Sequence, residues 1–454
     1  MFTHRLAATG LALAALVAAP LARADELQQL KDEVAAMRQA YEERMQALER
    51  RIAELQQAAP AAPAAAPPGE SPPSAQASAS GFNPAISLIV NGTYANLSRD
   101  PARWRIQGFI PSGGEVGPGK RSFQLGESEL GLAANIDPTF SGHITFSLTG
   151  DDSVSVEEAV FERQGLFSGG SLKAGRFLSS IGYLNSQHAH AWDFVDAPLA
   201  YQAFFGGPLK TDGVQLRWLA PTERFVELGV ELGSGASFPG NDTNRNGIGS
   251  TALFAHMGDD IGDSASWRAG VSYLHHRAVD RSYVDTFGFS RTHSFTGSSG
   301  TWVLDGTYKW APGGNATRQN FKLQGEYFRR RESGDMTFGL GSVAPTTGDY
   351  RSVQSGWYLQ AVYQFAPMWR AGARYDRLSS GSLRFAGDAV PADVSALLAP
   401  YAPSRSTVMV DYSLSEFSRF RLQLAADRSS PDGTDRQLFL QYIMSLGAHG
   451  AHTF

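Results

Sequence analysis

The chain has 454 residues, a formal net charge of −5 and no cysteine. Such a charge is unlike the basic field of nucleic-acid-binding proteins, and a chain without cysteine has no disulfide, thiolate zinc site or cysteine nucleophile. Beyond the N-terminus no apolar run reaches the roughly 20 residues that a transmembrane helix needs. Nucleic-acid binding and helical membrane spans are therefore excluded, whereas a β-barrel, whose strands alternate in polarity, remains open.

Residues 1–24 are predicted to form a secretory signal peptide. An apolar core over 6–19 precedes the small-residue cleavage motif Ala22-Arg23-Ala24. A membrane anchor is the alternative, but the core is short, and no cysteine follows that could carry a lipid. The exported chain is expected to begin at Asp25.

Residues 25–59 carry a narrow apolar stripe on a highly charged segment. Apolar residues step by three and four from Leu27 to Leu55, which is the pattern of a coiled-coil helix between chains. The alternative is a single amphipathic helix lying on its own protein. Residues 60–81 are rich in Ala, Pro and Ser, a composition that favours an extended linker.

Residues 82–454 repeat one pattern, in which alternating segments of about ten residues are separated by turns. In the last segment Leu438, Leu440, Tyr442 and Met444 share one parity, and the chain ends in Phe454. A core strand of a soluble all-β domain is the alternative for this segment alone. The region as a whole predicts an all-β fold, a transmembrane antiparallel β-barrel of about 16 strands, with 18 as the alternative. Strands are expected near 85–97, 122–136, 141–150, 153–163, 171–177, 211–219, 225–233, 249–257, 265–276, 300–310, 318–331, 353–366, 368–378, 405–414, 417–428 and 435–447.

The connections between these strands alternate in length. Short turns such as Asp137-Pro138-Thr139-Phe140 and Ala366-Pro367 are expected on one rim, and long loops on the other, as in outer-membrane barrels. The long connections are expected at 98–121, 178–210, 234–248, 277–299, 332–352 and 379–404. Both chain ends then fall on the short-turn rim, which places the coiled coil in the periplasm.

The two faces of the predicted strands differ in chemistry. One parity is apolar, has Trp and Tyr near strand ends, and is predicted to face lipid. The other parity carries charges that would be costly to bury unpaired, so a water-filled lumen is predicted. The predicted pore-lining residues are Glu127, Glu129, Arg217, Glu227, Glu231, Arg268, Asp305, Lys322, Glu326, Arg370, Arg374, Asp411 and Arg421. Because acidic residues dominate the earlier strands and basic residues the C-terminal half, we expect a transverse field and weak ion selectivity. The alternative is that these side chains pair and only hold the wall.

The connection 178–210 is too apolar and aromatic for a solvent-exposed loop. It is predicted to fold into the barrel as a constriction, because loops of this length are usually functional or disordered and this composition argues against disorder. Its candidate residues are Tyr183, Asn185, His188, His190, Trp192, Asp193, Asp196 and Tyr201. His188 and His190 with either aspartate could bind zinc. A structural role, with histidine bonded to loop backbone, is the favoured alternative, and no cofactor is predicted.

Enzyme signatures are absent from the sequence. It holds no G-x-S-x-G elbow, Walker A loop, H-E-x-x-H pair or G-x-G-x-x-G after a strand. No catalytic residue is therefore predicted, and the protein is expected not to be an enzyme.

The order of signal peptide, coiled coil, linker and barrel resembles the trimeric phosphate-selective porins of the O/P group. The run Leu172-Lys173-Ala174-Gly175-Arg176-Phe177 is similar to the strand that enters their constriction segment. The stretches 83–88 and 185–207 resemble a subgroup labelled zinc-regulated outer-membrane receptors. The resemblance implies a homotrimer. The predicted lumen shows no basic ladder, so phosphate selectivity is not carried over to this chain, and no plug domain is expected before the barrel.

The sequence thus predicts a homotrimeric outer-membrane porin that passes small hydrophilic solutes or ions by diffusion. Its expected partners are its own copies, outer-membrane lipid and lipopolysaccharide, and small solutes. A zinc-linked uptake channel is one alternative. A structural tether between the outer membrane and the periplasm, with a closed barrel as its anchor, is the other.

Overall fold

The computed structural model describes residues 84–447 except 114–115, 151, 242–245, 286–290, 341–344 and 387–396. The chain divides into two units, Met1–Ser80 and Gly81–Phe454, and the fold below is that of the second. The predicted signal peptide, coiled coil and linker, and the chain end after residue 447, lie outside the described residues. Within the described part, no helix has both the length and the apolar character needed to cross a membrane.

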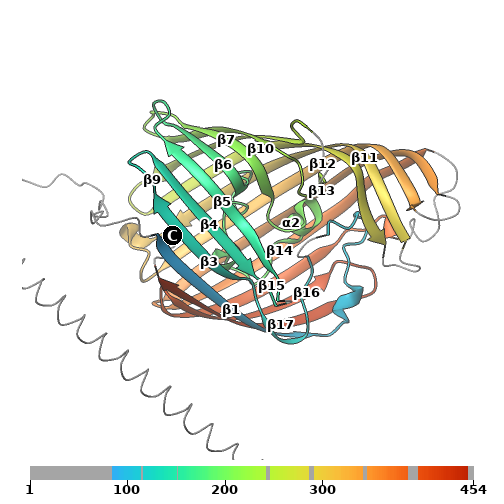
Figure 1. The fold of residues 1–454 in the computed structure, drawn as a ribbon. Coiled ribbons are helices and arrows are strands. Elements are labelled where there is room, and N and C mark those ends of the chain that lie inside the picture. The colour runs from blue at the N-terminus through green and yellow to red at the C-terminus, as the bar shows by residue number, and fades with distance from the viewer. Residues whose placement is uncertain are drawn as a thin grey trace, which may run out of the picture. The chain divides into compact units, whose positions relative to one another are not determined.

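The second unit is an antiparallel sheet that closes on itself (Figure 1). Its short helices are η1 (Pro101–Arg103), η2 (Ala189–Ala191), α2 (Leu199–Phe205) and η3 (Pro312–Gly314). Its strands are β1 (Ala85–Leu97), β2 (Ser122–Leu125), β3 (Ser128–Asn135), β4 (Phe140–Leu148), β5 (Val154–Gln164), β6 (Gly170–Leu178), β7 (Lys210–Leu219), β8 (Phe225–Gly233), β9 (Ser250–Ile261), β10 (Ala265–Asp285), β11 (Arg291–Trp310), β12 (Asn320–Leu340), β13 (Thr346–Ala366), β14 (Trp369–Ala386), β15 (Ser404–Ser415), β16 (Ser418–Arg428) and β17 (Asp435–Gly447).

Closure comes from the pairing of the first and last strands. β17 pairs with β1 from Gly447 opposite Ser87 to Gln437 opposite Leu97. β2 and β3 pair with successive stretches of β1, so they share one position in the ring. The 17 strands of the described residues therefore fill 16 positions (17 − 1). The predicted closed barrel of about 16 antiparallel strands is confirmed.

The outer face of this barrel is apolar. Trp302 and Leu304 on β11 are each 51% exposed, and the residues paired with Leu304 on β10 and β12, Val271 and Tyr327, share its face. Soluble proteins rarely expose an apolar surface that runs from strand to strand, whereas a barrel in lipid requires one. The structure places the residues of the predicted lipid face outward.

A second feature of the outer face is a change from aromatic to basic residues towards the long-loop rim. Tyr327 on β12 and Tyr375 on β14 are followed two residues later, on the same face, by Arg329 and Arg377. Aromatic rings and then arginines are the order expected where hydrocarbon gives way to charged headgroups. The boundary of the apolar band can therefore be located from the sequence of single strands.

Several predicted long loops are mostly strand. β10 and β11 extend to Asp285 and Arg291, β12 and β13 to Leu340 and Thr346, and β14 to Ala386. The prediction of loops over 277–299 and 332–352 was therefore wrong, and that over 379–404 was wrong as far as residue 386. The physical reason is that alternate residues of these extensions are buried in an apolar cluster that includes Ile110, Tyr283, Phe295, Met336, Tyr350 and Leu397.

The short connections match their predicted chemistry. In the turn after β3, Asp137 Oδ1 accepts hydrogen bonds from the backbone N–H groups of Thr139 (2.7 Å) and Phe140 (2.8 Å). A side chain that bonds the backbone two and three residues on stabilises a tight turn. β1 begins with Ala85 opposite Ala133, close to this turn, and β17 ends opposite Ser87. Both ends of the described chain therefore lie on the short-turn rim.

Candidate functional site

Residues 179–209, between β6 and β7, form a segment that we call the inner loop. Its ends are tied together, because Ser179 N donates to Leu209 O at 3.0 Å. The side chain of Asn185 completes the neck: its Nδ2 donates to the carbonyls of Ser179 (2.7 Å) and Leu209 (3.0 Å), and its Oδ1 accepts from Leu209 N (2.7 Å). The predicted loop residue Asn185 thus fixes where the loop leaves the wall.

An aromatic body holds the inner loop against the inside of the barrel. Every residue of α2 is buried. The rings of Tyr201, Phe204 and Phe205 lie around Phe328 of β12, with centroids 5.2, 5.7 and 5.6 Å from it. Aromatic side chains supply much of the apolar area that packing buries. The aromatic composition of the loop is therefore explained by packing inside the ring of strands, where α2 is seen in Figure 1.

A buried carboxylate on β12 fastens the start of the loop. Glu326 accepts hydrogen bonds from Leu184 N (2.9 Å) and from the hydroxyls of Tyr201 (2.9 Å) and Tyr358 (2.7 Å). Beside it, Gly182 has φ of +68°, and a Cβ there would lie 2.3 Å from Glu326 Oε2. Only glycine fits this position without displacing the carboxylate or straining the backbone.

Asp193 binds the loop to the basic side of the wall. It lies 2.5 Å from Lys322 Nζ and 3.2 Å from Arg370 Nη1, and Arg370 also contacts Asp411 at 2.5 Å. Burial acts to raise the pKa of Asp193, but the charges of Lys322 and Arg370 outweigh it and hold the pKa well below its usual value. The carboxylate therefore stays charged and paired.

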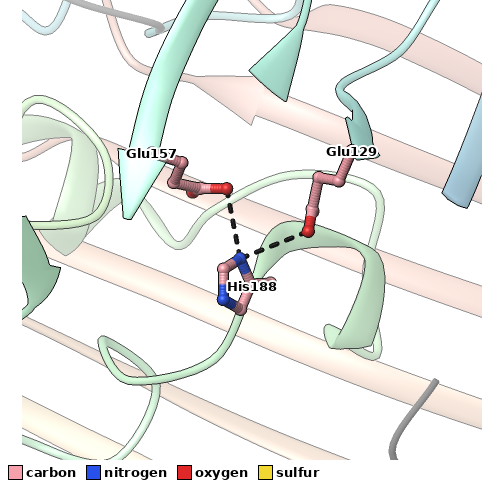
Figure 2. A group of neighbouring side chains, drawn as sticks. All are labelled: Glu129, Glu157 and His188. Atoms are coloured by element: carbon pink, nitrogen blue, oxygen red, sulfur yellow. Dashed lines mark hydrogen bonds and ion pairs between the residues drawn. The ribbon is translucent and has the colours of Figure 1, made fainter. Parts of the chain in front are cut away.

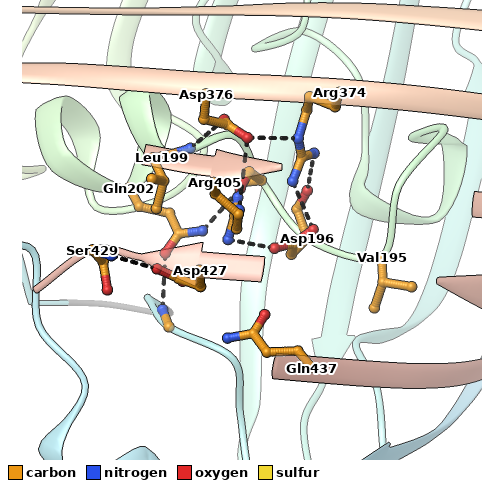
Figure 3. A network of polar contacts seen from close by, with 12 residues as sticks. Val195, Asp196, Leu199, Gln202, Arg374, Asp376, Arg405, Asp427, Ser429 and Gln437 are labelled. Atoms are coloured by element: carbon orange, nitrogen blue, oxygen red, sulfur yellow. Dashed lines mark hydrogen bonds and ion pairs between the residues drawn. The ribbon is translucent and has the colours of Figure 1, made fainter. Parts of the chain in front are cut away.

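Asp196 makes a second set of ion pairs, shown in Figure 3. It lies 2.8 Å from Arg374 Nη2 and 2.5 Å from Arg405 Nη1, and both arginines also contact Asp376. Asp376 in turn accepts from Leu199 N at 2.9 Å, at the start of α2. The two arginine side chains are only 1–2% exposed and Asp196 is 11% exposed, so the ion pairs are largely shielded from water.

On the opposite, acidic side of the wall the loop presents histidines. His188 Nδ1 lies 3.1 Å from Glu157 and 3.3 Å from Glu129 (Figure 2), and His188 Nε2 lies 3.0 Å from Glu158. His190 Nδ1 lies 2.7 Å from Glu129. Burial acts to lower the pKa of His188, but its hydrogen bonds with Glu157 and Glu158 raise the pKa well above the usual value.

A β-bulge explains how two consecutive glutamates reach one histidine. Opposite β4, Glu158 pairs with Thr145 and Val156 with Phe146, which leaves Glu157 as the extra residue. Bulges redirect a side chain that strict alternation would send to the other face. Both carboxylates are buried, at 1% exposure for Glu157 and 8% for Glu158. Sequence reasoning missed Glu157 and Glu158 for this reason; the only signal was two adjacent glutamates in an alternating strand.

The inner loop therefore spans the lumen with charges opposite to those of the two walls. Its histidines face carboxylates on β3 and β5, and its aspartates face cations on β12, β14 and β15. The asymmetry of wall charge that the sequence predicted is present, but the loop and cross-strand pairs neutralise much of it. Arg405, which sequence reasoning also missed, belongs to this pairing.

Most predicted pore-lining residues hold the loop or one another. Glu231 accepts from Ser179 Oγ (2.6 Å) and Ser180 N (2.8 Å), and Arg421 pairs with Asp411 (2.7 Å). The remaining contacts are these: Glu127 accepts from Ser147 Oγ (2.8 Å), Arg217 lies 3.6 Å from Glu227, Glu227 lies 3.0 Å from His256, Arg268 lies 3.8 Å from Asp305 and 5.2 Å from the ring of Tyr183, and Arg421 donates to Trp192 O (2.9 Å). Lining of a water path by these residues stays a prediction.

No family model matches the chain, whereas several solved structures resemble it. OprB of Pseudomonas putida is 14% identical, with 80% of this chain and 94% of that chain covered and a TM-score of 0.49. OmpT, an outer membrane protein of Vibrio cholerae, is 10% identical in its in-vitro folded trimer form, with 80% and 99% covered and a TM-score of 0.48. The outer membrane channel DcaP of Acinetobacter baumannii is 12% identical, with 80% and 97% covered and a TM-score of 0.45. The TM-scores of these three structures all lie below 0.5.

A relative in sequence is much closer. An uncharacterized protein of Aquifex aeolicus (strain VF5) is 31% identical over 400 residues, which cover 82% of this chain and 80% of the relative. The aligned region thus covers most of the length of both proteins. The chain therefore belongs to the same protein family as this uncharacterized Aquifex aeolicus protein.

Proposed function

We propose that the protein is an outer-membrane channel through which small hydrophilic solutes or ions diffuse passively, narrowed by the inner loop. One observation carries the proposal: charged side chains that water can reach lie inside a barrel whose outside is apolar. Inside, Arg217 is 33% exposed and Arg268 25%, whereas outside Leu304 is 51% exposed. A closed sheet with this polarity suits hydrocarbon outside and water within.

The water path runs along the side of the lumen that the inner loop leaves uncovered. Arg217 on β7 lies 3.4 Å from Glu162 and 3.6 Å from Glu227, and all three side chains are at least 14% exposed. On the other side Arg405 and Arg421 are 1–2% exposed beneath the loop. Because both charge signs line the exposed side, we expect weak ion selectivity.

Conductance tests the channel directly. Refolded protein in planar bilayers should give stable single-channel currents, with a reversal potential close to zero across a salt gradient. A strong preference for one ion sign would contradict weak selectivity. A barrel that carries no current would contradict the channel itself and favour the structural tether.

Assembly and surroundings are part of the same proposal. A homotrimer follows from the resemblance in domain order, and cross-linking of the refolded protein in detergent should give a species of three chains. Lipopolysaccharide is the expected lipid partner, because outward arginines such as Arg329, Arg377 and Arg428 are exposed beyond the aromatic residues. Their guanidinium groups suit phosphate. A location of the N-terminal helix in the periplasm completes the proposal.

Zinc-linked uptake is a second candidate function. It is favoured by one observation, the convergence of His188 with Glu129 and Glu157 on the lumen side. Zinc flux into liposomes that carry the protein separates the two functions. A general porin should pass zinc no faster than magnesium, whereas a dedicated zinc channel should pass zinc faster.

A further inference from the structure

The group around His188 has the geometry of a metal site. One ligand atom from each of Glu129, Glu157 and His188 lies within 4.8 Å of the other two (Figure 2). His188 Nδ1 lies 3.3 Å from the Glu129 oxygen and 3.1 Å from the Glu157 oxygen. In a tetrahedral zinc site with bonds of about 2.0–2.1 Å, neighbouring ligand atoms are about 3.3 Å apart. The two distances from the imidazole nitrogen already match this spacing.

The outer partners of these ligands are also in place. His188 Nε2, the nitrogen that points away from the two ligand carboxylates, lies 3.0 Å from Glu158. Glu158 is itself positioned by Leu178 N, which donates to it at 3.0 Å. Metal-binding histidines almost always donate their second N–H to a carboxylate, carbonyl or water, which fixes the ring orientation. Glu158 is thus the outer partner that a ligand at position 188 requires.

The second ligand, Glu129, has an orienting partner as well. His190 Nδ1 lies 2.7 Å from Glu129 Oε1, while the other oxygen of Glu129 faces His188. The third ligand, Glu157, is directed inward by the β-bulge in β5 and is almost completely buried. The ligands therefore come from three separate elements, β3, β5 and the inner loop, and each is oriented by a different part of the wall.

From this geometry we propose that Glu129, Glu157 and His188 bind a divalent transition-metal ion of the zinc class. An imidazole nitrogen with carboxylate oxygens suits zinc better than the hard ions calcium and magnesium, which prefer oxygen ligands alone. His188 keeps 22% of its side chain exposed, so water can reach the ion and fill the fourth position. The bound ion fastens the start of the inner loop to β3 and β5.

Binding of zinc to the refolded, metal-free full chain tests the proposal. Isothermal titration in detergent should saturate at one ion per chain, with calcium and magnesium failing to compete. Glu157→Gln and His188→Gln remove ligands and should weaken binding by more than about 100-fold, and Glu158→Gln should weaken it by about 10–100-fold, the range for outer partners. The experiment measures zinc binding and not conductance. Absence of zinc binding would therefore not contradict the channel proposal, and absence of conductance would not contradict the zinc site.

Matched controls separate this site from other histidines. Glu227→Gln removes a partly exposed carboxylate that lies 3.0 Å from His256, and it should leave zinc affinity unchanged. His449 and His452 are not among the proposed ligands, so a variant with both changed to Gln should also bind as the parent does. Full affinity in a Glu157→Gln, His188→Gln double variant would overturn the proposal, as would a parent chain that shows no saturable binding.

A measurement on the unaltered chain tests the proposal even where the variants do not fold. X-ray absorption at the zinc edge should show nitrogen and oxygen ligands at about 2.0–2.2 Å and the outer-shell scattering of imidazole. A spectrum of fully hydrated, six-coordinate zinc would overturn the proposal.

Discussion

Gly182 shows how much one residue constrains the inner loop. Its backbone φ is +68°, and a Cβ would meet Glu326 Oε2 at 2.3 Å. Gly182→Ala should lower the free energy of unfolding by about 1–2 kcal/mol from backbone strain alone, with a further loss where Glu326 moves away from Tyr201. Urea-dependent refolding into detergent measures the change.

Gly306 on β11 is the matched control for this prediction. Its φ is not positive, and no atom lies within 4 Å of a Cβ built there. Gly306→Ala should change the free energy of unfolding by no more than about 0.5 kcal/mol. Equal effects of the two substitutions would show that the loop does not depend on position 182.

The residues that contact His188 could be predicted from the sequence only in part. His188 and His190 were identified as candidate ligands, but Asp193 and Asp196, their expected partners, bind the opposite wall. The carboxylates that do face His188 come from β3 and β5, 30 residues and more away in the chain. Neither the bulge at Glu157 nor the crossing of the lumen by the loop has a local sequence signal, so the ligand set could not be predicted.

We propose that the inner loop sets the width of the channel. Its aspartates form ion pairs with the lysine and arginines of β12, β14 and β15. Removal of one partner of a buried ion pair lowers the free energy of unfolding by about 3–5 kcal/mol. In Asp193→Asn with Asp196→Asn, the loop should leave this wall, and Lys322 and Arg370 should then face water. We expect higher single-channel conductance and a shift of the reversal potential towards anion preference.

Asp432 supplies the control for the loop variant. It pairs with Arg105 at 2.6 Å on the rim, and its side chain is 26% exposed. Asp432→Asn removes one negative charge without touching the inner loop and should leave conductance unchanged. If the double loop variant also conducts like the parent, the loop does not set the channel width.

At the level of elements, the strands and the loops over 98–121, 178–210 and 234–248 were predictable, whereas the strand extensions within 277–299, 332–352 and 379–386 were not. Side chains alternate between the two faces of a strand, so Leu438, Leu440 and Tyr442 share one face whatever the length of the strand. The strand predicted at 435–447 accordingly agrees with β17. Extensions such as that of β12 to Leu340 are rich in Gly, Ser and charged residues, a composition typical of loops. They become strands because their inner residues bury against segments distant in sequence, such as Leu397.

The barrel formed by the described residues has an apolar outside and a charged inside. Leu304 lies on the outer face between Trp302 and Tyr308, well inside the apolar band. Leu304→Arg should destabilise the refolded protein in lipid by about 2–4 kcal/mol, whereas Glu223→Arg, in the turn after β7, should cost about 0–1 kcal/mol. Refolding into liposomes measures both, and equal small effects would argue against hydrocarbon around Leu304.

In the proposed channel, water fills the inside of this barrel and lipid surrounds it. Because the natural chain has no cysteine, single cysteines report on either side without background. In liposomes, a charged, membrane-impermeant thiol reagent should label Arg217→Cys, which faces the lumen, and should leave Leu304→Cys, which faces outward, unlabelled. Rapid labelling of Leu304→Cys together with protection of Arg217→Cys would contradict the account.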